Sequence, residues 1–140
     1  MEYIFKLTSW DKDKQALSLI RRKVFIEEQK VPEELEWDEF DKDSIQVLVT
    51  DKNNTPIATG RMKKDGHIGR MAVLKEYRHL GIGSRVLRTI IKEAKKLKLK
   101  SVYLHAQTTA IAFYQKQGFE INSEEFMDAG IPHKAMKLAL

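Results

Sequence analysis

Two glycines and a cation stand directly before a stretch that looks helical. Residues 78–84 read RHLGIGS, and Ser84 opens an apolar stripe typical of an amphipathic helix. Glycine lets backbone N–H groups approach a ligand, and the first turn of a helix adds unpaired N–H groups and the positive end of its dipole. Arg78 and Ser84 can add side-chain donors to an anion. The pattern favours phosphate binding, although a plain strand-to-helix turn would use Gly81 and Gly83 for their φ angles alone.

Two familiar phosphate loops do not fit this stretch. A Walker loop ends in Gly-Lys-Ser/Thr, but Gly83 is followed by Ser84 and Arg85. The dinucleotide-binding pattern needs a third glycine, and Val86 stands in that place. A phosphate site here must therefore be of another kind.

Histidine and arginine side chains supply further candidates. His133 follows Gly-Ile-Pro, a tight lead-in that fixes where the ring points, so we expect a catalytic residue there. Arg61 and Arg70 fall on neighbouring predicted strands, where they can bind an anionic group or pair with acidic residues. No residues have metal-ligand spacing such as HExxH, and the chain has no cysteine, so we predict no metal.

The composition limits the class of protein. The chain has 140 residues, of which 42% are hydrophobic and 32% charged, as in a soluble globular protein. No apolar run approaches the roughly 18–20 residues that span a bilayer, and the N-terminus lacks the features of a secretory signal. The absence of cysteine fits a reducing compartment. We predict a cytoplasmic protein with a single domain over residues 1–140 and no membrane association.

Charge is distributed unevenly along the chain. Residues 27–43 hold nine acids and two lysines, whereas residues 85–100 hold seven basic residues and one acid. A basic helix can bind nucleic acid, or it can simply be a solvated helix face. Because no aromatic residues are interleaved with the basic ones, we expect no nucleic-acid partner.

Hydrophobic periodicity predicts elements that alternate between strand and helix. We expect strands at 3–8, 45–50, 57–64, 67–74, 101–106, 119–122 and 134–140, and helices at 12–29, 84–97 and 108–117. Asp11 is the expected cap of the first helix, and Asp65-Gly66 the expected hairpin turn. The strand at 101–106 should be parallel to its neighbour because a helix precedes it. The order predicts a mixed α/β fold.

Two motifs together resemble those of the GNAT N-acetyltransferases. Arg-x-x-Gly-x-Gly at 78–83, between a strand and an amphipathic helix, is similar to the acyl-CoA-binding motif of that family, and AIAFYQKQGF at 110–119 is similar to its second motif. The segments RRKVFIEEQKVPEELEWDEFD and FMDAGIPHKAM further resemble the ElaA/YjcF-type branch. The resemblance implies a GNAT acyl-CoA N-acyltransferase fold of α+β type, with a central mixed, mostly antiparallel sheet flanked by helices.

The resemblance also implies an activity: direct transfer of an acetyl group from acetyl-CoA to an amine of a small-molecule or peptide acceptor. The strand at 70–74 would splay from the strand at 101–106 and admit the cofactor. The implied cofactor-binding residues are Met71, Ala72, Val73, Arg78, His79, Leu80, Gly81, Ile82, Gly83, Ser84 and Gln107, the last in place of a common asparagine. Tyr114 would protonate the leaving thiolate. Many members form dimers, so a homodimer stays open.

The remaining roles are less defined by the resemblance. Glu28 is our first choice for the general base, and His133 is a further expected catalytic residue. Asp38, Asp41 and Arg70 are the expected substrate contacts. Related proteins often carry a histidine where this chain has Gln46, which cannot act as a base. Gln46 and Gln107 therefore keep one alternative open, a catalytically silent CoA-binding module. The basic helix leaves a second, a basic nucleic-acid-binding domain.

Overall fold

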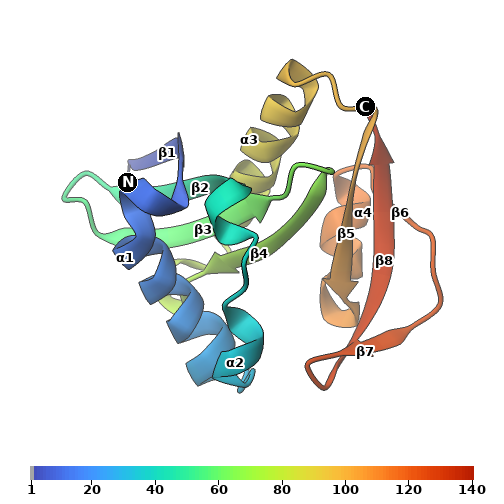
Figure 1. The fold of residues 1–140 in the computed structure, drawn as a ribbon, viewed down its shortest axis with the longest axis horizontal. Helices are drawn as coiled ribbons and strands as arrows, with labels where there is room; N and C mark the ends of the chain where they lie inside the picture. Colours follow the sequence, from blue (N-terminus) through green and yellow to red (C-terminus); the bar gives the residue numbers. More distant parts are fainter. Residues whose placement is uncertain (1) are drawn as a thin grey trace.

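The computed structural model describes residues 2–140, whose fold is shown in Figure 1. The strands are β1 (Tyr3–Thr8), β2 (Ile45–Asp51), β3 (Pro56–Met62), β4 (His67–Val73), β5 (Ser101–Gln107), β6 (Glu120–Ile121), β7 (Phe126–Asp128) and β8 (Ile131–Ala139). The helices are α1 (Trp10–Arg21), α2 (Glu33–Glu36), α3 (Ile82–Lys96) and α4 (Ile111–Lys116), and a π-helical segment, Arg22–Glu28, continues α1. Short 3-10 turns lie at Asp41–Asp43, Lys75–Tyr77 and Thr108–Ala110. Among the strands and α-helices, α2 and β7 were not predicted.

The strands of residues 2–140 form one sheet in the order β1-β2-β3-β4-β5-β8-β6, with β7 paired to β8. Neighbouring strands are antiparallel except β4 and β5, which are parallel, as expected for strands joined through a helix. Gly66 in the turn between β3 and β4 has a φ of 94°, and Lys63 N donates to His67 O over 2.9 Å. These observations confirm the predicted fold class and the hairpin.

Two hydrophobic clusters lie on opposite faces of the sheet. Leu48 of β2 packs in one cluster with Leu17 and Ile20 of α1, while its neighbours Val47 and Val49 pack in the other, which includes α3. This alternation follows from the strand period of two, and it explains why β2 reads as a continuous apolar run. Helices α1 and α3 therefore cover the two faces.

The start of α1 differs from the prediction. Ser9, not Asp11, is the N-cap, and its Oγ accepts a hydrogen bond from Lys12 N over 3.3 Å. Asp11 lies in the first turn, where its negative charge still favours the helix dipole. Both residue types suit a helix start, so the sequence left two starts open.

β4 and β5 separate soon after they begin. They pair only at residues 67–68 of β4 against 103–104 of β5. β4 then carries a bulge at 70–71, opposite Gly60 of β3. Because a bulge bends its strand, β4 turns away from β5, and the two strands diverge in Figure 1. The predicted splaying of these strands is confirmed.

Candidate functional site

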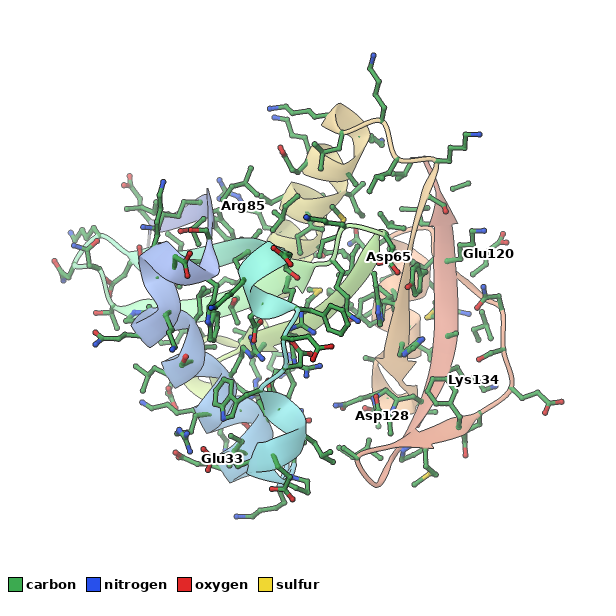
Figure 2. All side chains as sticks on the ribbon, in the orientation of Figure 1. Glu33, Asp65, Arg85, Glu120, Asp128 and Lys134 are labelled. Atoms are coloured by element: carbon green, nitrogen blue, oxygen red, sulfur yellow. The ribbon has the colours of Figure 1, made fainter. Side chains whose placement is uncertain are left out.

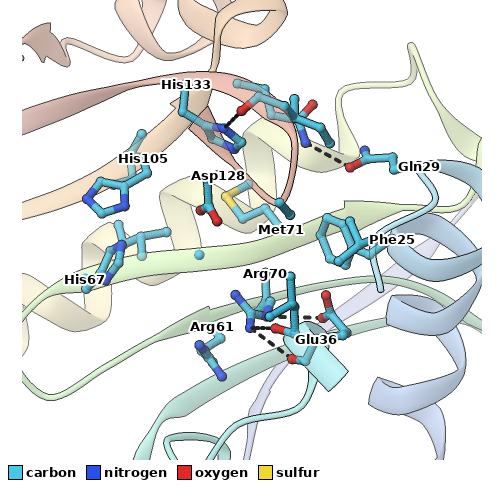
Figure 3. A pocket seen from close by; sticks show the side chains of 18 of the residues that line it. Phe25, Gln29, Glu36, Arg61, His67, Arg70, Met71, His105, Asp128 and His133 are labelled. Atoms are coloured by element: carbon cyan, nitrogen blue, oxygen red, sulfur yellow. Dashed lines mark hydrogen bonds and ion pairs between the residues drawn. The ribbon is translucent and has the colours of Figure 1, made fainter. Parts of the chain in front are cut away.

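A cavity of about 320 Å³ lies where β4 and β5 diverge (Figure 3). Residues from the π-helical segment, α2, β3, β4, β5, α4 and the β7–β8 hairpin line it. In Figure 3, Arg61, Arg70 and Glu36 lie on one side, and His133 and Asp128 lie across from them. Figure 2 likewise places α2 and Asp128 on opposite sides of the divergence. The cavity therefore has two walls of different origin.

The bulge in β4 is held in place from behind by α3. Arg70 occupies it with a φ of 50°, a left-handed conformation that non-glycine residues rarely adopt. A Cβ on the opposing Gly60 would lie 2.8 Å from Val86 Cγ1 and 3.3 Å from Met71 Cγ, so only glycine fits there. Strained residues persist where their surroundings fix them, and they gather at functional sites.

The glycine loop, residues 79–84, links the end of β4 to α3. Its backbone N–H groups have no hydrogen-bond acceptor within residues 2–140. His79 and Gly81 have φ angles of 66° and 80°, and such left-handed positions within a loop favour a concave arrangement of amides. The side chain of Ile82, only 3% exposed, anchors the loop in the core. The loop thus presents free donors on a fixed base.

Arg78 and Glu28 form an ion pair beside this loop. The Arg78 guanidinium donates to both carboxylate oxygens of Glu28 over 2.6 Å, and its Nε donates to Val73 O over 2.9 Å. The hydrogen bond from Arg78 is the main cause that lowers the pKa of Glu28. Glu28 does not line the cavity. A carboxylate held in this way is a poor proton acceptor, which argues against its expected role as the general base.

Tyr114 lies in the wall of the cavity, on α4. Its hydroxyl is 4.0 Å from Met71 Sδ at the bulge, and its ring packs edge-on against Phe113 and Phe119. Burial raises the pKa of Tyr114 to about 12. The phenol therefore holds its proton at neutral pH and can donate it into the cavity.

His133 lies in the opposite wall and is 8% exposed. Its Nδ1 is 2.7 Å from Ile131 O. Because a carbonyl oxygen only accepts hydrogen bonds, Nδ1 carries the proton and Nε2 of the neutral ring is left as an acceptor. The prediction that the Gly-Ile-Pro lead-in fixes this ring agrees with the bond to Ile131.

Six charged side chains form a closed ring of alternating sign, which we call the charged ring. In order, they are Arg21, Glu36, Arg70, Asp38, Arg61 and Asp41, each joined to the next by an ion pair of 2.6–3.3 Å. The members come from α1, α2, β3, β4 and the turn after α2. The charged ring therefore fixes the acidic segment against the sheet, and its net charge is zero.

Membership of the charged ring changes the interpretation of two predicted substrate contacts. Asp41 is 2% exposed and does not line the cavity, so the structure does not bring it to a substrate. Asp38 does line the cavity, but its oxygens already accept from Arg61, Arg70 and Phe40 N. Burial alone would raise the pKa of Asp38, and these cations and hydrogen bonds lower it. We therefore leave Asp41 out of the proposed acceptor site.

Two glutamines raised questions from the sequence. Gln107 lines the cavity, and its Nε2 donates to Gln29 Oε1 over 2.9 Å, which ties the end of β5 to the residue after the π-helical segment. Gln46 is fully buried and does not line the cavity. Its Nε2 donates to Asp41 O over 3.2 Å, so it supports the charged ring rather than the cavity.

Among the charged or titratable residues of the cavity wall, sequence reasoning missed three: Lys63, His67 and Asp128. The tertiary fold brings them together from the end of β3, the start of β4 and β7. Burial, with the charges of His105 and Lys63, lowers the pKa of His67 to about 4. The only available signal was the period-two spacing of residues 61 and 63 in the predicted strand at 57–64, which would place both side chains on one face.

Within residues 2–140, no helix is long and apolar enough to cross a membrane. The same residues contain no group of three or more His, Asp or Glu side chains arranged to hold a metal ion.

The comparisons with known proteins agree with one another. Residues 10–140 match the family model of the acetyltransferase (GNAT) domain. Two relatives from Bacillus subtilis, uncharacterized protein YyaT and uncharacterized N-acetyltransferase YjcF, are 44% identical over 122 residues and 40% identical over 121; each match covers 84% of this chain, and 82% and 86% of the relatives. The crystal structure of Escherichia coli ElaA superposes with a TM-score of 0.87 at 26% identity, covering 97% of this chain and 99% of ElaA. These matches confirm the resemblance that the sequence motifs indicated.

Proposed function

The chain belongs to the GNAT acetyltransferase family, and from that premise we propose that it moves the acetyl group of acetyl-CoA directly to an amine of a small-molecule or peptide acceptor. The family supports acyl transfer from coenzyme A in general. The choice of acetyl-CoA and of an amine is our proposal. It rests above all on one observation: the cavity opens where β4 and β5 part, and a loop of unpaired amides follows β4 along the chain.

The glycine loop suits the diphosphate of coenzyme A. Free N–H groups at 79–84 and the start of α3 offer donors to phosphate oxygens, and Arg78 can add a cation if it exchanges Glu28 for phosphate. The part of β4 that does not pair with β5, Met71 to Val73, and Gln107 of β5 would hold the pantetheine arm between them. Bound there, acetyl-CoA supplies an activated thioester.

Tyr114 is the proposed general acid. Its protonated hydroxyl lies beside Met71 at the bulge, where the thiolate would leave. A phenol suits this step because it is still protonated at neutral pH when the thiolate forms. It can recover the donated proton from solvent afterwards. The edge-on contacts with Phe113 and Phe119 hold its ring in position.

His133 is the proposed general base, in preference to Glu28. Its Nε2 is the free acceptor of a ring whose tautomer the Ile131 carbonyl fixes. It can take the proton that an amine must lose in order to attack. Glu28 is committed to Arg78 and lies outside the cavity wall.

Release of free thiol from acetyl-CoA, measured against a panel of amines with spontaneous hydrolysis subtracted, tests this proposal. We expect amine-dependent release and a higher melting temperature with acetyl-CoA. Stabilisation without release for any amine would instead support a catalytically silent CoA-binding module. A protein that neither binds nor turns over acetyl-CoA would contradict both. The cytoplasmic location and the homodimer stay predictions, for fractionation and light scattering to check.

A further inference from the structure

We propose that the acceptor amine carries a second, anionic group, a carboxylate or a phosphate, and that Arg70 and Lys63 bind this group inside the cavity. The inference rests on the proposed function, because it names the acceptor class of the same site. It follows from counting which charged groups in the cavity wall still have free hydrogen-bonding capacity.

Most members of the charged ring have little free hydrogen-bonding capacity. Asp38 accepts two bonds from Arg61, one from Arg70 and one from a backbone N–H, so it cannot also hold a substrate ammonium at full strength. Arg61 is 3% exposed, and both of its Nη atoms already donate to Asp38 or Asp41. The sequence offered both Arg61 and Arg70 as candidates for an anion, with Arg70 as the expected substrate contact, and the difference in exposure favours Arg70.

Arg70 is the most exposed arginine of the ring, and it has free donors. Its Nη2 donates to Glu36 O over 2.9 Å and to Asp38 Oδ2 over 3.3 Å, and its Nε lies 3.1 Å from Glu36 Oε2 without the alignment of a hydrogen bond. Its Nη1 has no partner within residues 2–140. The side chain is 26% exposed and lines the cavity, so Nη1 can reach a ligand.

The environment of Arg70 also favours an added anion. Burial is the leading cause that lowers the pKa of its guanidinium, and the nearby Arg61 and Arg21 act in the same direction. Glu36 and Asp38 raise this pKa, by less than burial and the two arginines lower it. A carboxylate or phosphate at Nη1 would complete the compensation, and guanidinium geometry suits both groups.

Lys63 supplies a second cation in the same wall. Its Nζ lies 4.0 Å from the centre of the Phe40 ring, and it has no acidic partner within ion-pair distance in residues 2–140. Its charge acts on the cavity, since it helps to lower the pKa values of both His67 and His105. These two histidines are accordingly neutral near pH 7, and they do not add to the positive charge.

The wall across the cavity has the opposite character. Asp128 lines it, and its carboxylate has neither a hydrogen bond nor an ion pair with the described residues. His133 stands in the same wall with Nε2 as an acceptor. An amine would therefore face Asp128 and His133, while its anionic group faces Arg70 and Lys63. A ligand with both charges matches both walls, whereas a simple amine or a polyamine matches only one.

Binding of matched amine pairs to the coenzyme A complex tests the inference directly. The pairs are 4-aminobutyrate with butylamine, and O-phosphoethanolamine with ethanolamine, measured by calorimetry. We expect the anionic member of at least one pair to bind about tenfold more tightly or better, because a charge-assisted contact contributes that much. The two pairs show whether carboxylate or phosphate is preferred. Equal or weaker binding of both anionic members, including no binding by any amine, would overturn the inference.

Three variants assign the effect to residues. Lys63→Gln should reduce this preference about threefold to tenfold and leave the neutral amines unchanged, and the exposed neighbour Lys64→Gln should change neither. Arg70→Gln should abolish the preference. Because Arg70 also belongs to the charged ring, Lys63→Gln keeps the test valid if that variant does not fold. A preference unaffected by Lys63→Gln and Arg70→Gln would contradict the assignment.

Thiol release in the same samples tests the proposed function separately. Anionic amines that bind through Arg70 and Lys63 without releasing thiol would leave the inference standing and remove the proposed activity. Thiol release with butylamine or ethanolamine, but not with their anionic partners, would support the proposed activity and contradict the inference.

Discussion

The glycine loop and the charged ring are built in opposite ways. The loop is one short stretch, 79–84, whose backbone donors are left without partners, while the ring joins side chains from five parts of the chain and satisfies nearly all of them. Free donors are suited to binding a ligand, and saturated charges are suited to holding an element in place. Substitutions in the ring should therefore affect stability, and substitutions in the loop should affect ligand affinity.

The largest expected effect is on stability, from Asp41→Asn. The change leaves the buried guanidinium groups of Arg21 and Arg61 short of a counter-charge. Breaking a buried pair in this way costs about 3–5 kcal/mol of unfolding free energy. Urea unfolding should show the loss, and the affinity of the folded fraction for coenzyme A should be unchanged.

A matched surface variant sharpens this prediction. Glu33 of α2 pairs with Arg22 over 2.7 Å, but both side chains are largely exposed. Glu33→Gln should leave the unfolding midpoint almost unchanged, since exposed pairs contribute little. Equal effects of Glu33→Gln and Asp41→Asn would mean that the charged ring does not hold the acidic segment.

The next effect is on turnover, from Tyr114→Phe in the cavity between the two regions. The change removes the hydroxyl beside Met71 and keeps the ring that packs on Phe119. We expect kcat to fall about a hundredfold, with little change in coenzyme A affinity. Tyr103→Phe is the control, because that hydroxyl contacts Asp65 outside the cavity. Unchanged turnover in Tyr114→Phe would assign the protonation of the thiolate to water.

A smaller effect on ligand affinity is expected from Gly81→Asp. A Cβ at Gly81 meets nothing within 4 Å, but its φ of 80° strains any side chain. Gly81→Asn carries nearly the same strain without the charge, so the difference between the two variants isolates electrostatic repulsion of phosphate. Calorimetry should give about tenfold weaker coenzyme A binding for Asp than for Asn. Equal affinities would place the diphosphate away from the loop.

The same contrast explains what could be read from the sequence. The loop, the hairpin at Gly66 and the helix α3 are local, so their residue types and spacing were sufficient to predict them. Even the divergence of β4 and β5 followed from the family resemblance. Cooperation between distant residues could not be predicted in this way: Asp41 looked like a substrate contact until its partners Arg21 and Arg61 were placed.

The cavity between β4 and β5 is the clearest case of this limit. Lys63 and Asp128 lie far apart in the sequence, yet both line one cavity. Lys63 belongs to no motif, and Asp128 lies in the segment FMDAGIPHKAM without a role assigned to it. Glu28 suggested a base because of its place at the end of a helix, but its bond to Arg78 depends on a residue 50 positions away. A catalytic role that depends on a free lone pair can be assigned only when the hydrogen-bond partners of all neighbouring groups are known. Residue spacing alone does not supply them.

The smallest expected effect concerns His67, which lines the cavity but does not belong to the charged ring. Burial lowers its pKa to about 4, against about 6.5 in an unfolded chain. Between these values the unfolded chain binds a proton that the folded protein does not, so stability is complete above pH 6.5 and falls as the pH drops toward 4. Because the ring is partly exposed, we expect a loss of only about 1 kcal/mol, which His67→Gln should remove in urea unfolding compared at pH 7 and pH 4.5. Lys63→Gln should raise the His67 titration midpoint in NMR, since Lys63 contributes to the shift. A midpoint near 6.5 in the unmodified protein would mean that the cavity wall around His67 is open to water. It would then not be the enclosed surface, fixed by charges, that the charged ring implies.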